Sequence, residues 1–290
     1  MTRVVVTGAG GQLGHALLAT APPTCHVIGL DRAAMDIADE SSVLAVIRAH
    51  QPDIIVNAAA FTAVDDAESR PEDAHRANAD GPAILARAAR ECGARIVHVS
   101  TDYVFDGRAG RAYRPDDAAH PLNVYGQSKR AGELAVLQHG GAAATVVRTS
   151  WLYGRTGRNF VRTMLRRLRE PGAVRVVADQ IAAPTRVDTF ADAVWAITRT
   201  PSVHGIVHWC DAGVASWYDL AVAVSEEARA VGLLDASADV GPVPSSAYPT
   251  RATRPAFSLL DVGDLPGRLD VTRLHWRTSL RAMLQSMPHA

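Results

Sequence analysis

The first half of the chain alternates short runs of β-branched residues with longer Ala-, Leu- and Arg-rich segments of helical period, and this alternation most constrains the fold. Strands that alternate with helices form a parallel sheet with helices on both faces. We therefore predict an α/β fold with a doubly wound parallel sheet. The expected strands are Val4–Thr7, His26–Leu30, Asp53–Asn57, Arg95–Ser100 and Ala144–Arg148, and the expected helices are Leu13–Ala19, Ser41–His50, Pro71–Ala77, Gly81–Glu91 and Tyr125–Gln138.

A glycine-rich turn, Gly8-Ala9-Gly10-Gly11-Gln12-Leu13-Gly14, follows the first expected strand and opens the first expected helix. Its glycines permit a tight turn and let a pyrophosphate approach the amides at the positive end of the helix. Asp31 directly follows the end of the second expected strand, as in dinucleotide-binding sheets of the Rossmann type. Asp31 suits an adenosine ribose, which favours NAD, whereas Arg32 suits a 2′-phosphate, which favours NADP. The sequence leaves both cofactors open.

Tyr125 and Lys129 lie four residues apart in an expected helix and therefore share a face. A free tyrosine titrates near ~10, and a nearby positive charge lowers such a pKa by about 1–3 units. We expect Lys129 to lower the pKa of Tyr125, so that Tyr125 serves as a general acid near neutral pH. Thr101 follows an apolar run and is expected at the carboxyl end of a strand, where such sheets bind ligands. The three groups suit protonation of a carbonyl oxygen during its reduction.

The second half of the chain is less regular. It is expected to contain helices at Asn159–Glu170, Asp188–Thr200 and Trp217–Val231, strands at Val174–Val177 and Gly205–Cys210, a Pro/Ser-rich passage at Pro242–Pro255 and a short terminal helix. A chain of 290 residues exceeds one ordinary domain. We predict a dinucleotide-binding Rossmann domain over residues 1–170, to which segments near 186–210 return. A smaller α/β substrate-binding lobe is expected over residues 171–290.

Composition argues against several classes of partner. Lys plus Arg and Asp plus Glu both number 30, so no net field draws the protein to nucleic acid or to anionic membranes. The 3 cysteines and the histidines match no metal-ligand spacing, and no metal is expected. Neither a leader pattern nor an apolar stretch of the ~18 residues that a membrane span needs is present. We expect a cytoplasmic protein, either a monomer or a homodimer, whose partner is a small molecule.

Several further motifs, taken with those above, resemble the dTDP-4-dehydrorhamnose reductase family of extended short-chain dehydrogenases/reductases over nearly the whole chain. The segments that carry the resemblance are Thr7–Gly14, Val56–Asp65, Ser100–Phe105, Pro121–Gly126, Arg148–Tyr153, Asn159-Phe160, Asp179-Gln180 with Ala183–Thr185, and Tyr248–Thr250 with Arg254-Pro255. The combination is much more specific than the glycine turn or the Tyr-Lys pair alone.

The resemblance implies an NAD(P)H-dependent reductase that converts the C4 keto group of dTDP-4-dehydro-β-L-rhamnose to the alcohol of dTDP-β-L-rhamnose, and it favours NADPH. It implies that Thr101, Tyr125 and Lys129 are catalytic. The cofactor would contact Gly8, Gly11, Gln12, Leu13, Asp31, Arg32, Asp36, Ile37, Ala58, Ala59, Ala60, Thr62, Val99, Tyr125 and Lys129. The sugar nucleotide would contact Thr101, Asp102, Trp151 and Arg254. For its diphosphate, Arg254 is the first candidate and Arg155 and Arg158 are others, because arginine suits phosphate.

Two other functions remain open at this point. The first is a 4-ketoreductase for another dTDP-4-keto-6-deoxyhexose of an antibiotic pathway, because sequence does not set the stereochemistry at C4. The second is a non-catalytic regulatory subunit of the methionine adenosyltransferase type, which one branch of the family resembles. The intact set of Thr101, Tyr125 and Lys129 argues against the second.

Overall fold

The central element of the computed structural model, which describes residues 1–235 and 239–288, is a six-stranded sheet with the order β10-β5-β4-β3-β1-β2. Every neighbouring pair of its strands runs parallel. The strands are β1 (Thr2–Thr7), β2 (Cys25–Leu30), β3 (Ile54–Asn57), β4 (Arg95–Thr101), β5 (Ala144–Thr149) and β10 (Gly205–His208). The expected α/β fold with a parallel sheet is confirmed, and β10 joins the sheet from the second half of the chain.

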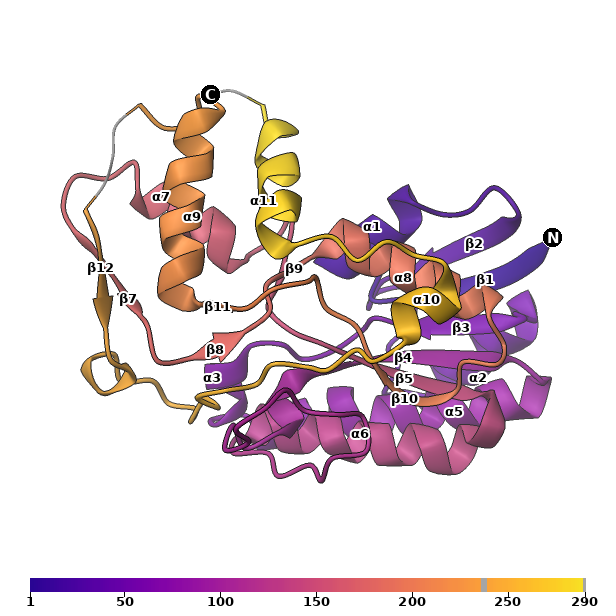
Figure 1. Cartoon of the computed structure of the whole chain (residues 1–290). Coiled ribbons are helices and arrows are strands. Elements are labelled where there is room, and N and C mark those ends of the chain that lie inside the picture. The colour runs from indigo at the N-terminus through magenta and orange to yellow at the C-terminus, as the bar shows by residue number, and fades with distance from the viewer. Residues whose placement is uncertain (236–238, 289–290) are drawn as a thin grey trace.

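Helices cover both faces of this sheet (Figure 1). On one face lie α1 (Gln12–Ala19), α8 (Val187–Arg199) and α10 (Leu265–Leu269), which share a core with Val4, Val6 and Val56 of the strands. On the other face lie α2 (Glu40–His50), α5 (Gly81–Cys92) and α6 (Val124–Gly140), which pack on Val5, Ile55 and Ile96. The central strands β1, β3, β4 and β5 are largely buried on both faces, which is why they read as apolar runs in the sequence.

A second lobe stands above the sheet layer (Figure 1). It contains α7 (Phe160–Arg167), α9 (Trp217–Ala230) and α11 (Trp276–Gln285), with the parallel pair β7 (Val174–Val177) and β12 (Val240–Val243). Its hydrophobic core begins with Tyr153 and includes Val161 and Leu165 of α7. We therefore propose that this lobe begins near Tyr153, earlier than the boundary at 171 that we expected. The short pairs β6 (Leu152–Tyr153) with β9 (Thr185–Arg186), and β8 (Ile181–Ala182) with β11 (Ala215–Ser216), complete the strands.

The chain between β3 and β4 differs most from expectation. A short helix, α3 (Val64–Ala67), was not anticipated. Beyond it, α4 (Pro71–His75) continues through a π-helical turn at Arg76–Asp80 directly into α5, whereas we expected two helices separated by a break. The buried Asn78 of this turn accepts a hydrogen bond from the Phe61 amide and donates one to the Phe61 carbonyl, at 2.8 and 3.0 Å. The turn therefore fixes the segment that follows β3.

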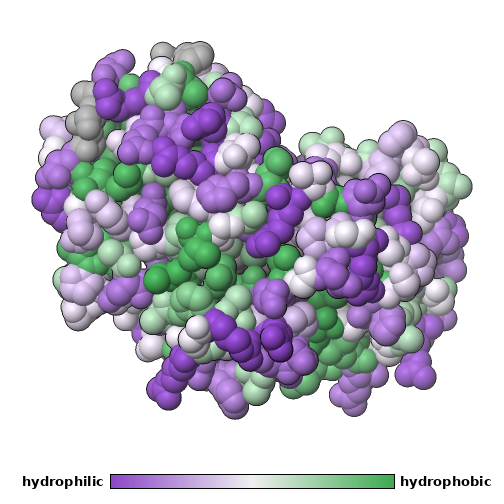
Figure 2. Space-filling model, viewed as in Figure 1, coloured by the Kyte–Doolittle hydropathy of each residue, from purple (hydrophilic) through white to green (hydrophobic). Residues whose placement is uncertain are grey.

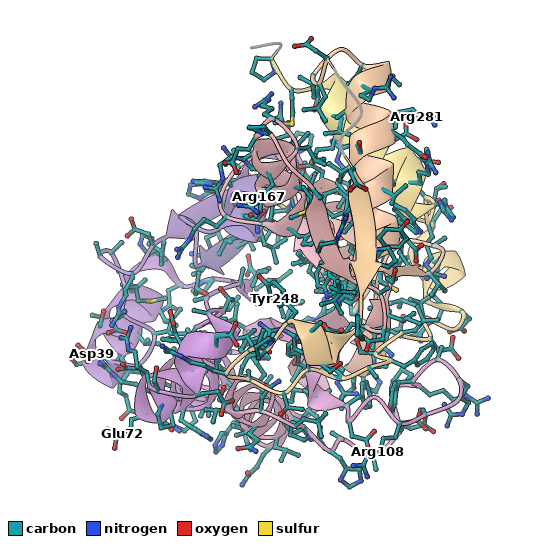
Figure 3. All side chains as sticks on the ribbon, turned by 90° about the vertical axis from the view of Figure 1, so that its left-hand side faces the viewer. Asp39, Glu72, Arg108, Arg167, Tyr248 and Arg281 are labelled. Atoms are coloured by element: carbon teal, nitrogen blue, oxygen red, sulfur yellow. The ribbon has the colours of Figure 1, made fainter. Side chains whose placement is uncertain are left out.

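The face shown in Figure 2 carries both hydrophilic and hydrophobic side chains. Hydrophobic side chains gather near its middle, and an indentation lies between the upper lobe and the sheet layer. Figure 3 shows Tyr248 near the middle of the view, below Arg167 of the upper lobe, with Asp39 and Glu72 of the sheet layer at the left. Among the residues that the structure describes, no helix combines the length and the apolar character needed to cross a membrane.

Strand order locates the ligand site. The chain moves from β1 outward to β2, then returns to the other side of β1 to form β3. Sheets of this kind bind ligands at such a reversal, outside the carboxyl ends of the strands. A cleft of about 880 Å³ lies there, between the sheet and the upper lobe.

Candidate active site

The glycine turn between β1 and α1 is shaped so tightly that side chains would not fit. Gly8 has a φ of +67°, and a Cβ on it would lie 2.7 Å from the Cα of Ala59 at the end of β3. A Cβ on Gly14 would lie 2.2 Å from the Gly8 carbonyl oxygen. Gly11 caps α1 without a side-chain hydrogen bond, so the first amides of the helix are left for another acceptor. The turn therefore fits the pyrophosphate of a dinucleotide.

The cleft brings together all the residues that we expected to bind a cofactor or to catalyse, together with Asp102 and Trp151 of those expected at the sugar nucleotide. It is lined by Gly8, Gly11, Gln12, Leu13, Asp31, Arg32, Asp36, Ile37, Ala58, Ala59, Ala60, Thr62, Val99, Thr101, Asp102, Tyr125, Lys129 and Trp151. Arg254 is not among the lining residues. Arg70, Arg76 and Arg158 line the cleft as well, and of these only Arg158 was considered from the sequence. Arg70 and Arg76 belong to the segment whose π-helical turn no sequence pattern revealed.

Acidic and basic groups alternate where the adenosine end of a dinucleotide would lie. Asp31 accepts a hydrogen bond from the Ala34 amide at 2.9 Å. The carboxylate of Asp36 faces Arg76 at 2.9 Å and Arg32 at 3.8 Å. Both cations are therefore held beside Asp36, and neither NADPH nor NADH is singled out by this arrangement.

Thr101, Tyr125 and Lys129 come from two adjoining elements. Thr101 ends β4, and Tyr125 and Lys129 lie in the first half of α6, which begins at the Asn123 cap. The Asn123 side chain accepts a hydrogen bond from the Gly126 amide at 2.8 Å, which fixes the start of the helix. The spacing-based prediction that these three residues share one site agrees with their common place in the lining of the cleft.

The expected effect of Lys129 on Tyr125 was wrong. Burial raises the pKa of Tyr125 to about 12, and the polar side chain of the neighbouring Thr101 opposes this rise only in part. The Lys129 Nζ donates to the Val99 carbonyl at 2.6 Å, at the rear of the cleft. Burial lowers the pKa of Lys129 to about 8, although the charge of Glu133 opposes this change. Tyr125 is therefore protonated at neutral pH, as a proton donor must be.

Asp102 is buried directly behind Thr101. The Thr101 hydroxyl donates to Asp102 Oδ1 at 3.1 Å, and the Ser258 hydroxyl donates to Asp102 Oδ2 at 2.5 Å. Burial raises the pKa of Asp102 to about 7, against the effect of these two hydrogen bonds. Ser258 belongs to the chain segment that follows the Pro/Ser-rich passage, and sequence inspection did not identify it.

Trp151 and Arg254, both expected to contact the sugar nucleotide, differ from each other in their neighbours. Trp151, with a φ of +47°, lines the cleft, and its ring stacks on that of Trp217 with centroids 3.4 Å apart. Arg254 is engaged elsewhere: its guanidinium donates to both carboxylate oxygens of Asp65, at 2.6 and 3.2 Å. Binding of a diphosphate by Arg254 stays a prediction.

The cofactor turn also contacts the second lobe. The Asn159 side chain donates to Gln12 Oε1 at 2.8 Å, and its own Oδ1 caps α7 by accepting from the Arg162 amide at 3.0 Å. Asn159 thus links the first helix of the sheet layer to the first helix of the upper lobe.

Comparison with known proteins agrees with this site. The RmlD substrate binding domain family matches residues 1–288. A dTDP-4-dehydrorhamnose reductase of Salmonella typhimurium is 39% identical, over 98% of this chain and 97% of that protein. A probable dTDP-4,6-dihydroxy-2-methyloxan-3-one 4-ketoreductase of Streptomyces antibioticus is 44% identical, over 96% of this chain and 93% of that protein.

A solved structure extends the likeness to three dimensions. The dTDP-4-dehydrorhamnose reductase of Bacillus anthracis str. Ames, in complex with NADP, has a TM-score of 0.92 and 35% identity, and the match covers 99% of this chain and 100% of that one. Sequence and structure thus agree over almost the full length, and the chain belongs to the dTDP-4-dehydrorhamnose reductase family.

Proposed function

We propose that the protein is an NAD(P)H-dependent reductase that converts dTDP-4-dehydro-β-L-rhamnose to dTDP-β-L-rhamnose. The observation that carries this proposal is the convergence of Thr101, Tyr125 and Lys129 on the same cleft as the glycine turn. The dTDP-4-dehydrorhamnose reductases among its relatives supply the substrate class.

In the proposed reaction, bound NADPH or NADH supplies the hydride that reduces C4 of the keto sugar. Tyr125 donates its phenolic proton to the C4 oxygen as negative charge develops there. Its raised pKa suits this role, because the phenol stays protonated until an alkoxide of comparable basicity forms. The Thr101 hydroxyl, which donates to Asp102 in this structure, would turn to donate to the same oxygen. Lys129 places an ammonium at the rear of the cleft.

The cofactor is assigned to the residues around the glycine turn. The pyrophosphate would be held by Gly8, Gly11, Gln12 and Leu13, and the adenosine ribose by Asp31. The part of the cleft that leads toward the nicotinamide would be lined by Ala58 to Ala60. The NADP complex of the Bacillus anthracis relative supports NADPH as one cofactor. Arg32 and Arg76 are the cations nearest to Asp36 that could meet a 2′-phosphate.

The sugar nucleotide is assigned to the other end of the cleft. Trp151 offers an aromatic face to the 6-deoxy sugar, and Asp102 lies beside the reacting group. The diphosphate would be met by Arg158, which lines the cleft, or by Arg254 once it leaves Asp65.

A second candidate function is reduction of a different dTDP-4-keto sugar. The Streptomyces antibioticus relative supports it, because its identity of 44% exceeds the 39% of the Salmonella reductase. Both candidates use the same hydride and proton transfer and differ in the sugar that Trp151 and its neighbours accept.

The deciding experiment is to follow oxidation of NADPH and NADH separately, with dTDP-4-dehydro-β-L-rhamnose generated by the preceding dehydratase and epimerase. Oxidation that requires the epimerase and yields dTDP-rhamnose supports the first candidate. Oxidation without the epimerase supports the second. Replacement of Tyr125 by Phe should slow turnover by about 10²–10⁴-fold, whereas cofactor binding, followed by fluorescence, should change little. Unchanged turnover in the Tyr125→Phe variant would contradict the assigned role.

A further inference from the structure

A row of polar side chains crosses the otherwise apolar face of the sheet that α6 covers. Thr7, Asn57 and His98 are register partners on β1, β3 and β4. All three are buried, with exposed fractions of 1%, 0% and 0%. Thr7 donates to Asn57 Oδ1 at 2.7 Å, and Asn57 Nδ2 lies 3.0 Å from His98 Nδ1. Lys129 Nζ stands at the end of the row, 3.5 Å from His98 Nε2.

The orientation of the Asn57 amide is fixed by its neighbours. Its Oδ1 accepts from the Ala59 amide at 3.2 Å as well as from Thr7. A backbone N–H is only a donor, so a reversed amide would place two donors face to face. Asn57 Nδ2 therefore points to His98 and must donate to Nδ1. A neutral imidazole whose Nδ1 accepts carries its hydrogen on Nε2.

His98 is neutral in this position. Burial, and next the charge of Lys129, hold the pKa of His98 well below its ordinary value. The neutral ring accordingly presents Nε2–H, a donor, to the ammonium of Lys129. The two distances fit this reading: Lys129 Nζ lies 2.6 Å from the Val99 carbonyl, a true acceptor, and stays 3.5 Å from the ring nitrogen.

We propose that His98 is a positioning residue for Lys129: Asn57 locks the imidazole as the Nε2–H tautomer, and the ring hydrogen denies the ammonium a second acceptor in the sheet besides the Val99 carbonyl, so that its remaining hydrogens face the cleft. The same ring hydrogen stabilises the uncharged amine, because a lysine that has lost its proton can accept from Nε2–H. The role rests on the proposed function, in which Lys129 acts at the reacting end of the cleft.

Other charged groups around Lys129 do not replace this effect. Glu133 lies one turn further along α6, but its carboxylate is engaged by Arg148 of β5 at 2.7 Å and by Arg130 at 2.8 Å. Tyr125, on the same helix, is protonated at neutral pH, and Asp102, beside β4, is engaged by Thr101 and Ser258. His98 is thus the polar side chain that Lys129 contacts behind the cleft.

The composition of the chain makes a direct test simple. Of the 30 lysine and arginine residues, Lys129 is the only lysine. Protein labelled with ¹³C-lysine therefore gives one Cε resonance, whose shift against pH reports the titration of Lys129 without any ligand. The ¹⁵N shifts of His98, assigned by its loss in a His98 variant, report which ring nitrogen carries the hydrogen.

Wild type and two His98 variants distinguish an effect of the ring hydrogen on the Lys129 titration from an effect of packing alone. In wild type we expect hydrogen on His98 Nε2 and a Lys129 midpoint below the free-lysine value of ~10.4. In His98→Phe, which keeps a ring but no donor, the midpoint should rise by about half a unit or more. In His98→Gln, whose amide oxygen can accept from Lys129, it should rise further. The alkaline limb of the pH profile of kcat/KM should move with the midpoint in each variant.

Hydrogen on Nδ1 in wild type would overturn the proposal; this measurement is made on wild type, and a His98 variant serves only to assign the signal. Equal Lys129 midpoints in wild type, His98→Phe and His98→Gln would also overturn it, because burial alone would then set the titration. Both NMR readouts use the free protein. A failure of the keto-sugar assay would therefore count against the proposed function and leave the test of His98 intact.

Discussion

When Asp102 is replaced by Asn, the free energy of unfolding of the variant should increase relative to that of wild type as the pH rises. Asp102 is 2% exposed and its pKa is raised from 3.8 to about 7, chiefly by burial. At about 1.36 kcal/mol for each pH unit, this rise corresponds to roughly 4 kcal/mol. The isosteric amide cannot ionise and escapes this penalty.

The sign follows from the direction of the change. Because the pKa of folded Asp102 lies above that of the unfolded chain, its contribution to stability is complete below pH 3.8, where the carboxyl is protonated in both states. That contribution is lost as the pH rises, and the loss is complete above the folded pKa of about 7. Between pH 5 and pH 8, the free energy of unfolding of Asp102→Asn should therefore gain roughly 2–3 kcal/mol on that of wild type.

Urea unfolding of both proteins at pH 5, 6, 7 and 8 measures this difference, and carboxylates other than Asp102 cancel in it. The Ser258→Ala variant is the matched control. It removes the hydroxyl that donates to the Asp102 carboxylate, so the pKa should rise further and the loss of stability should extend to higher pH. A gap between wild type and Asp102→Asn that stays constant from pH 5 to pH 8 would refute the assignment of a buried, titrating carboxyl.

Two further predictions concern the framework of the site. Glu133 is buried, and its carboxylate accepts hydrogen bonds from Arg148 at 2.7 and 2.8 Å. Arg148→Met removes this partner, so we expect the free energy of unfolding in urea to fall by about 3–5 kcal/mol. The Arg148→Met/Glu133→Leu double variant should recover most of this loss, and a larger loss in the double variant would contradict this account. Gly14→Ala places a Cβ 2.2 Å from the Gly8 carbonyl and should cost about 1–3 kcal/mol of stability and weaken dinucleotide binding measured by calorimetry, whereas Gly110→Ala, which meets no atom within 4 Å, should change neither.

The parts of the fold that were predictable are those in which a local pattern and tertiary burial agree. Val4 to Val6 and Ile54 to Val56 are apolar on both faces because helices cover both sides of the sheet, so their strands were readable as continuous runs. The π-helical turn at Arg76–Asp80 was not readable, because Asn78 is held by the backbone of Phe61, seventeen residues away. A contact at that range leaves no periodic signal in the sequence.

The site shows the same division. Many of its members were identified because they lie near a strand end or a helix start, which parallel strands gather at one edge, and Lys129 was identified from its spacing to Tyr125. The pKa values of these residues were not predictable, because the pKa of Tyr125 depends on burial and on the direction in which Lys129 points. The spacing of the two residues determines a shared helix face; the Val99 carbonyl determines where the ammonium goes.

The groups around position 129, the Val99 carbonyl and the His98 ring, explain why a lysine stands there. Lys129 is the single lysine among the 30 lysine and arginine residues, and all the others are arginine. If this position needed only a positive charge, arginine would be expected here too. A guanidinium stays charged and presents five donors in a rigid fork, which the single Val99 carbonyl and the donor face of His98 would leave largely unsatisfied. An amine can be charged or neutral, and burial brings the pKa of Lys129 to about 8, whereas a guanidinium would stay protonated. Lysine at position 129 therefore places a titratable cation beside the donor face of His98, which arginine could not supply.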